Sequence, residues 1–337
     1  MTMGMELEIT ESGFGQVEIF NELTPDMQRF HLEGTTPMVL KGQGFKALMQ
    51  EFRGERFSAW YSRYWIKSPT VLNARGNIPF LELRIGWRNI IRGSMESIDE
   101  PELKMHYFTI SFDTHVNTTA IFEAAAQYET FDIHIDVRML YEFGVDYKVL
   151  QEFIDKVLTG RAGNIGDTTY SCPKIMIDAV FAILTSPYSG KEKKLFMECK
   201  IKEILISALV SIGTPEKILP SVLNSKDKEK LDEARQFIAL SVPSYPGNKK
   251  ICRRTGLNET KLSVGFKHFF GQSPYDYFLH QKMLMAKEML LSTDDTMEVI
   301  SAKLDYRWAT AFAREFKKHF GYTPSDFARN HGRPRKR

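Results

Sequence analysis

The first part of the chain, residues 14 to about 138, alternates apolar or aromatic positions with polar ones in short segments that Gly, Pro and Asn separate. A period of two residues is typical of β-strands with one face against a core. The clearest segments are Phe57 to Ile66, Phe80 to Trp87, Met105 to Phe112 and Phe131 to Val137. The pattern predicts a β-rich region that is either a barrel or a sandwich.

Beyond about Tyr147 the apolar spacing lengthens to about 3.6 residues, which is typical of amphipathic helices. Helices are predicted for residues 149–157, Ile175 to Leu184 and Leu195 to Ile212. Residues 213–225 contain two prolines and several polar residues, so they predict a linker. The pattern after the linker is helical, with short turns.

The last third of the chain contains an internal repeat with an offset of about fifty positions. Residues 251–257 precede a helix predicted to end at Phe270, and residues 300–306 precede one predicted to end at Phe320. Each end is followed by Gly, then by Ser or Thr, Pro and Asp, which suit a left-handed helix stop and a capped new helix. Helix, tight turn and helix is the helix-turn-helix pattern, whose second helix enters the DNA major groove.

The second helix of each unit has a predicted core face and a predicted exposed face. The core face of the first helix carries Leu262, Phe266, Phe269 and Phe270, and that of the second carries Trp308, Phe312, Phe316 and Phe320 at four-residue steps. The exposed faces match at an offset of fifty and carry Thr260, Ser263, Val264 and Lys267 in one helix and Thr310, Ala313, Arg314 and Lys317 in the other. Arg suits a bidentate guanine contact, Thr and Ala methyl groups suit thymine, and Lys suits phosphate.

A single helix from Pro274 to about Leu291 is predicted between the two units. At 1.5 Å per residue it would span roughly 25 Å. A rigid spacer of this length can place two recognition helices about one DNA turn, ~34 Å, apart on one side of the duplex.

The charge of the chain is distributed unevenly. The net charge is only +3, but residues 226–337 hold 22 Lys and Arg against 13 Asp and Glu, a net of +9, and the first 225 residues carry a net of −6. The basic excess coincides with the repeat, as expected of a polyanion-binding region. A basic tail, residues 331–337, can grip phosphates, although a solvated terminal charge run is the commoner case.

Three cysteines with no CxxC spacing predict neither a disulfide framework nor a zinc knuckle. The acidic N-terminus and the absence of a long uncharged apolar run predict a cytoplasmic protein without a membrane anchor.

The residues from about Asp232 to Arg329 resemble the AraC/XylS family of bacterial transcription regulators. The resemblance rests on both helix-turn-helix units, the connecting KMLMAKEMLL and the closing KHFGYTPSDF, in the family's order. It implies a sequence-specific DNA-binding regulator that is more often an activator. The candidate DNA-binding residues are Thr260, Lys261, Ser263, Val264, Lys267, Arg307, Ala309, Thr310, Ala313, Arg314, Lys317 and Lys318.

Two positions depart from the family pattern. Asp305 stands where the second unit usually has Gly, which is tolerable because Asp adopts the left-handed region more readily than most residues. The first recognition helix has no Arg on its exposed face, which weakens the case for a strong guanine contact by that unit.

The helical stretch Tyr147 to Leu209 is loosely similar to the siderophore-responsive, pyochelin-regulator-like subgroup of the family. The resemblance implies a domain that senses a small-molecule effector, for example a siderophore, and that dimerises. A candidate aromatic and cationic ligand pocket consists of Trp60, Tyr61, Arg63, Tyr64 and Trp65. Strand alternation would instead send these residues to opposite faces, which leaves core packing as the alternative.

No catalytic motif, metal site or cofactor is predicted. His106, His115 and His134 with Asp113 and Asp136 have no metal-ligand spacing, so scattered structural histidines are the preferred interpretation. A barrel enzyme fused to a DNA-binding module and an architectural DNA-binding protein are the alternatives to a regulator.

The predicted fold is α+β: a β-rich, cupin-like barrel or sandwich with a helical extension, followed by an all-α domain with two helix-turn-helix units. The predicted divisions are residues 1–213 for sensing and dimerisation, 214–225 for the linker, 226–330 for DNA binding and 331–337 for the basic tail. The expected partners are double-stranded DNA, an effector, a second copy of the chain and RNA polymerase.

Overall fold

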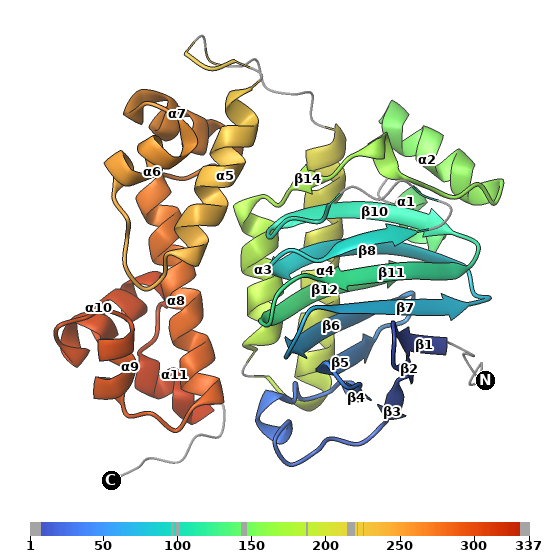
Figure 1. Ribbon diagram of the computed structural model, residues 1–337, viewed down its shortest axis with the longest axis horizontal. Helices are drawn as coiled ribbons and strands as arrows, with labels where there is room; N and C mark the ends of the chain where they lie inside the picture. The colour runs from blue at the N-terminus through green and yellow to red at the C-terminus, as the bar shows by residue number, and fades with distance from the viewer. Residues whose placement is uncertain are drawn as a thin grey trace. The chain divides into compact units, whose positions relative to one another are not determined.

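The computed structural model describes residues 8–95, 98, 102–142, 147–186, 188–213, 220, 222–224 and 226–330. The chain divides into two compact units, Met1–Pro215 and Glu216–Arg337 (Figure 1). Most of the predicted linker, residues 214–225, and the whole predicted basic tail, residues 331–337, lie outside the described residues.

The first unit contains two antiparallel β-sheets. The five-stranded sheet has the order β2-β1-β7-β11-β9, formed by Gly15–Gln16, Glu8–Glu11, Thr70–Gly76, Val116–Phe122 and Arg92–Met95. The nine-stranded sheet has the order β13-β10-β8-β12-β6-β5-β4-β3, with β14 also on β10. Its strands are β3 Glu18–Phe20, β4 Thr36–Lys41, β5 Phe45–Arg53, β6 Phe57–Ile66, β8 Phe80–Arg88, β10 Tyr107–Asp113, β12 Gln127–Ile135, β13 Gly163–Asn164 and β14 Tyr170–Ser171.

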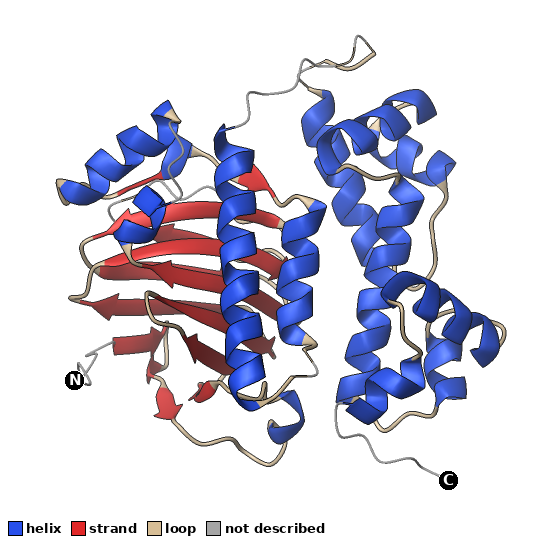
Figure 2. Ribbon diagram, turned by 180° about the vertical axis from the view of Figure 1, so that it is seen from behind, coloured by secondary structure: helices blue, strands red, loops and turns tan. Residues whose placement is uncertain are grey.

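Helices cover the outer face of the nine-stranded sheet (Figure 2). They are α1 Val137–Glu142, α2 Lys148–Leu158, α3 Lys174–Leu184 and α4 Gly190–Gly213. Alternate strand residues such as Leu83, Ile110 and Ile133 are fully buried in one cluster with the apolar stripes of these helices. The short η1 Gln28–Phe30 and η2 Ile165–Asp167 complete the unit.

The inner face of the nine-stranded sheet packs against the five-stranded sheet. Phe45, Ile66 and Tyr128 from the larger sheet share a buried cluster with Leu72 and Phe122 from the smaller one. The unit is therefore a two-sheet sandwich with a helical layer, and the predicted β-rich region with a helical extension is confirmed. Burial of apolar residues on both faces of the larger sheet stabilises this layering.

The second unit is all-helical in its described residues, as predicted. Its helices are α5 Asp227–Leu240, α6 Asn248–Thr255, α7 Glu259–Phe270, α8 Pro274–Ser292, α9 Met297–Lys303, α10 Ala309–Phe320 and α11 Pro324–Asn330. Two separate cores share α8, since Tyr277 and Phe278 pack with α5 to α7 and Met283 and Leu290 pack with α9 to α11. Figure 1 shows α8 running through both halves.

The glycine stops and caps of the repeat have the predicted geometry. Gly271 and Gly321 end α7 and α10 in the left-handed conformation, with φ of 71° and 86°. The hydroxyl of Ser273 accepts a hydrogen bond from the Asp276 N–H at 3.1 Å, and Thr323 caps Asp326 in the same way at 3.1 Å. Local capping thus fixes where each recognition helix stops and the next helix begins.

Candidate nucleic-acid interface

The first helix-turn-helix unit consists of α6 and α7. Gly256 turns the chain between them with φ of 67°, and the Asn258 side chain caps α7 by accepting from the Lys261 N–H at 2.8 Å. Leu262 and Phe266 are fully buried, so this face of α7 packs into the unit. Gly265 lies so close to α5 that an added Cβ would be 2.3 Å from Leu231 Cδ1. The opposite face of α7 is therefore held outward.

The second unit consists of α9 and α10 and repeats this geometry. Asp305 takes the place of the turn glycine with φ of 59°, and its carboxylate accepts a hydrogen bond from the Ser244 hydroxyl at 2.8 Å. Phe312 and Phe316 are fully buried. The left-handed turn expected at Asp305 is present, and the hydrogen bond to its side chain comes from a residue 61 positions earlier in the chain.

The side chains predicted to face DNA lie mainly on the exposed faces of α7 and α10. Those that are exposed are Thr260, Ser263 and Lys267 on α7 and Thr310, Arg314, Lys317 and Lys318 on α10. Those that are half-buried are Val264, Ala309 and Ala313. Figure 1 shows α7 and α10 at the two ends of α8.

Lys261 is placed differently from the rest of the predicted set. Its ammonium group lies 2.7 Å from an oxygen of Asp227, at the start of α5, and the lysine side chain is only 25% exposed. The hydrogen bond from Lys261 lowers the pKa of the Asp227 carboxyl. Lys261 therefore links α5 to α7, and its charge is already compensated within the unit.

Trp308 was predicted to be buried with Phe312 and Phe316, and this is wrong, because its side chain is 62% exposed. Trp308 is the N-cap residue of α10, with an extended backbone at φ −137° and ψ 137°, so helical spacing does not apply to it. The Arg307 guanidinium lies 5.3 Å from the centre of the Trp308 ring. The structure thus places an exposed indole at the N-terminus of α10.

Known proteins match this part of the chain. A family model described as a helix-turn-helix domain matches residues 251–330. The "F1 operon positive regulatory protein" of Yersinia pestis is 37% identical over 73 residues, 22% of this chain and 24% of that protein. The "Regulatory protein PchR" of Pseudomonas aeruginosa is 25% identical over 123 residues, 36% of this chain and 42% of that protein.

The C-terminal unit is an AraC/XylS-type helix-turn-helix domain. A solved structure described as a transcriptional regulator with an AraC-type DNA-binding domain, from Chromobacterium violaceum, covers 33% of this chain and 100% of its own, with 21% identity and a TM-score of 0.30. The chain matches less than half the length of either curated relative, so the comparison bears on the AraC/XylS-type domain rather than on the whole protein.

The candidate ligand residues outside the AraC/XylS-type domain lie on two faces of β6. Tyr64 belongs to the cluster between the sheets, with its ring 5.0 Å from that of Phe122, and burial raises its pKa to about 12. Alternation places Trp60 on the same inner face. Tyr61, Arg63 and Trp65 point to the other face. The structure therefore does not bring the five residues together in one pocket.

On the outer face of β6, Tyr61 and Arg63 belong to a polar cluster around Glu129. Arg63 Nε lies 3.1 Å from Glu129, and its guanidinium lies 4.7 Å from the Phe30 ring centre. Tyr61 donates a hydrogen bond to Glu129 at 2.6 Å. Burial alone would raise the pKa of Glu129, but the guanidinium groups of Arg63 and Arg88 lower it below its ordinary value. These interactions are those of a buried ion pair that connects strands.

The histidines considered as metal ligands have separate partners. His115 Nδ1 lies 3.5 Å from Asp113, His134 Nε2 lies 3.5 Å from Glu82, and the His106 ring centre lies 5.4 Å from that of Trp87. Within the described residues no three or more His, Cys, Asp or Glu side chains converge as a metal site requires. No described helix is long and apolar enough to span a membrane.

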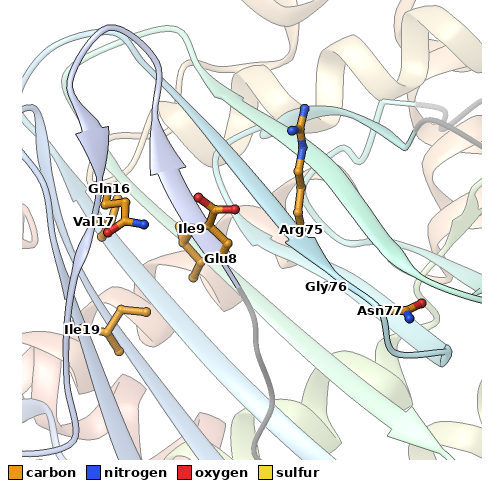
Figure 3. Close-up of a pocket in the computed structure, with 8 residues that line it drawn as sticks. All are labelled: Glu8, Ile9, Gln16, Val17, Ile19, Arg75, Gly76 and Asn77. Atoms are coloured by element: carbon orange, nitrogen blue, oxygen red, sulfur yellow. The ribbon is translucent and has the colours of Figure 1, made fainter.

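A surface hollow of about 600 Å³ lies at the β1, β2 and β7 edge of the five-stranded sheet (Figure 3). Glu8 and Arg75 are its charged lining residues, beside apolar Ile9, Val17 and Ile19. None of the five candidate ligand residues lines it.

Proposed function

We propose that the chain is a sequence-specific DNA-binding transcription regulator, and that it activates transcription rather than represses it. The observation that carries the proposal is the repetition of one geometry: α7 and α10 follow left-handed turns and present matching exposed faces at an offset of fifty residues. A pair of such helices joined by one rigid helix suits two successive segments of the major groove.

The two exposed faces suggest a division of labour. Arg314 is the candidate for a bidentate guanine contact, and Thr260 and Thr310 are suited to thymine methyl groups. Lys267, Lys317 and Lys318 are suited to phosphates, which position the protein without reading sequence. Trp308 and Arg307 join the proposed surface because both are exposed at the start of α10.

We assign residues 1–213 to sensing and dimerisation, residues 226–330 to DNA binding, residues 214–225 to the linker and residues 331–337 to a basic tail. An effector bound by the first unit, for which a siderophore is one candidate, would bias the chain toward one of two states with different affinity for DNA. A second copy of the chain and RNA polymerase are the proposed protein partners, and a cytoplasmic location is part of the proposal, as expected of a DNA-binding regulator.

Competition binding at fixed salt tests the proposal. The full chain is titrated against a duplex obtained by selection from random sequence and against bulk DNA. A regulator is expected to prefer the selected duplex by about 10³-fold or more. An architectural DNA-binding protein would bind both about equally, and that result would contradict the proposal.

A further inference from the structure

The two helix-turn-helix units also touch each other away from α8. The chain between α5 and α6, residues 241–247, lies beside the middle of α8 (Figure 1). From this loop the Ser244 hydroxyl donates a hydrogen bond to the Asp305 carboxylate at 2.8 Å. Asp305 lies in the turn between α9 and α10. The loop that leads into the first unit thus contacts the turn that leads into the second recognition helix.

A lysine of α8 lies at the same junction. The Lys282 ammonium group is 4.2 Å from the centre of the Tyr306 ring and 5.6 Å from that of the Phe278 ring. Phe278 belongs to the core of the first unit, and Tyr306 packs against the core of the second. Lys282 is only 8% exposed, and a cation shielded from water is attracted strongly to aromatic rings. The ammonium group therefore links the two cores.

The Asp305 carboxylate contributes both charge and a hydrogen-bond acceptor to this junction. Burial lowers the pKa of Lys282 below its ordinary value, and the negative charge of Asp305 offsets part of this effect. Asp305 adopts a left-handed backbone with φ of 59°, which is less favourable for Asp than for Gly. The Gly that the family resemblance predicts here would avoid this strain but would offer no side chain to Ser244. Asp305 therefore fits a role at the junction as well as in the turn.

The shared helix α8 does not by itself fix the angle between the two units. Its two halves pack in separate cores, and long helices bend. The angle matters on DNA, because one added base pair moves a site by about 3.4 Å along the duplex and turns it by about 35°. Contacts beside α8, such as those of Ser244 and Lys282, resist a rotation of one unit against the other.

We propose that Ser244, Lys282, Asp305 and Tyr306 form a clasp that fixes the second helix-turn-helix unit relative to the first, so that the protein accepts one spacing between two blocks of base sequence. The four are positioning residues that act through α7 and α10. Once α7 is bound, a fixed orientation raises the effective concentration of α10 at its own block. The inference rests on the proposed function, because spacing matters only if both helices read DNA.

The dependence of affinity on spacing tests the clasp. The full chain is titrated against the selected duplex and against two derivatives, with one base pair added or removed between the two blocks. Fluorescence anisotropy at fixed salt gives the three affinities. The unaltered chain should bind either derivative at least about tenfold more weakly, because α10 then meets the wrong base pairs.

The double variant Ser244→Ala, Lys282→Met removes the hydroxyl donor and the cation and keeps an unbranched apolar side chain on α8. Its loss on either derivative should shrink to about threefold or less, because the second unit can reorient. Its affinity for the selected duplex should fall about three- to tenfold as the effective concentration drops. The variant Ser244→Thr, Lys282→Arg keeps a hydroxyl and a cation, so it should restore the spacing preference.

Ser241→Ala is the matched control in the same loop. It removes a hydrogen bond of 2.6 Å from the Ser241 hydroxyl to the Phe237 carbonyl, and both partners belong to the first half of the domain. This variant should keep the full spacing preference. A purely structural role of the clasp would weaken binding to all three duplexes alike and leave their ratios unchanged.

A measurement without DNA tests the fixed orientation separately. Residual dipolar couplings are measured for backbone amides of the full chain. Couplings from α5 to α7 and from α9 to α11 should fit one common alignment tensor in the unaltered chain and two different tensors in the double variant. Two tensors for the unaltered chain, or one for the double variant, would overturn the clasp.

The binding data can overturn the clasp in three further ways. The unaltered chain binds all three duplexes alike, the double variant keeps the spacing penalty of the unaltered chain, or Ser241→Ala flattens the spacing preference as much as the double variant does. In each case a preference for the selected duplex over bulk DNA leaves the proposed regulator standing. A chain without that preference would overturn the proposed function, and the spacing role of the clasp with it.

Discussion

The two helix-turn-helix units have the same backbone design and different chemistry. Both turn through a left-handed residue, Gly256 in one and Asp305 in the other, and both bury two aromatic or aliphatic side chains of the second helix. The position of Arg314 in α10 is occupied by Val264 in α7. Lys261 of α7 is engaged by Asp227, whereas Arg307 and Trp308 extend the exposed surface of α10.

The backbone geometry of the two units and the side chains that they expose are therefore set independently of each other. Turn conformation and helix stops are set by a few local residues, so two units can share them and still carry different exposed side chains. We therefore expect the second unit to contribute more sequence discrimination, and the first to contribute mainly position and phosphate contact.

The largest expected effect comes from breaking one unit's core. Phe316→Ala should cost about 3 to 5 kcal/mol because a fully buried aromatic ring is lost. Since the two cores share only α8, hydrogen exchange should accelerate strongly in α9 to α11 and less in α6 and α7. Phe266→Ala is the matched variant and should give the reverse distribution. Equal acceleration in both units for both variants would show that the cores are not separate.

Arg314→Ala tests base readout directly. It should weaken binding to the selected duplex by about 1 to 3 kcal/mol and binding to random DNA much less, because a bidentate guanine contact is lost. Val264→Ala, at the matching position of the first unit, should change both affinities little. Fluorescence anisotropy at fixed salt measures both variants. If Val264→Ala costs as much selectivity as Arg314→Ala, the proposed asymmetry between the units is wrong.

Lys267 and Lys317 occupy matching positions, so Lys267→Ala and Lys317→Ala should affect DNA binding alike. Each should weaken selected and random duplexes similarly and reduce the slope of log K against log salt by about 1, because one phosphate contact is removed. A salt titration of each variant gives the slope. A variant that lost affinity for the selected duplex alone would be a base reader instead.

The turn residues should give the smallest effects. Gly256→Ala should cost about 1 kcal/mol, because Ala is strained at a φ of 67°. Asp305→Gly should change stability by less than about 1 kcal/mol, since relief of left-handed strain offsets the lost hydrogen bond from Ser244. Urea unfolding measures both. A larger loss for Asp305→Gly than for Gly256→Ala would mean that the Ser244 contact, rather than the turn, holds the second unit together.

Local signals made the second unit of the chain predictable from its sequence. Ser273, Thr323 and the glycines after Phe270 and Phe320 act within a few residues of themselves, so their pattern is visible in the chain. Trp308 was misplaced because periodicity says nothing about a residue that precedes its helix. The bond between Lys261 and Asp227 joins residues 34 positions apart, beyond the reach of any local pattern.

The strands of the first unit could be predicted from the sequence, but the surroundings of their side chains could not. The alternation in β8 predicts that Leu81 and Leu83 are buried and that Glu82 and Arg84 lie on the other side. Whether that other side meets solvent depends on where the five-stranded sheet packs, which is a tertiary property. The same limit applies to Trp60 and Tyr61, whose neighbours are set by layers that the sequence alone does not arrange.

Selection of duplexes by the full chain, followed by hydroxyl-radical footprinting, tests the central claim most directly. With α8 spanning 19 residues, or about 28 Å at 1.5 Å per residue, α7 and α10 should protect two blocks about one helical turn apart. Arg314→Ala should retain both blocks on the selected duplex and lose guanine selection in only one. A single protected block, or protection spread evenly along the duplex, would contradict the account.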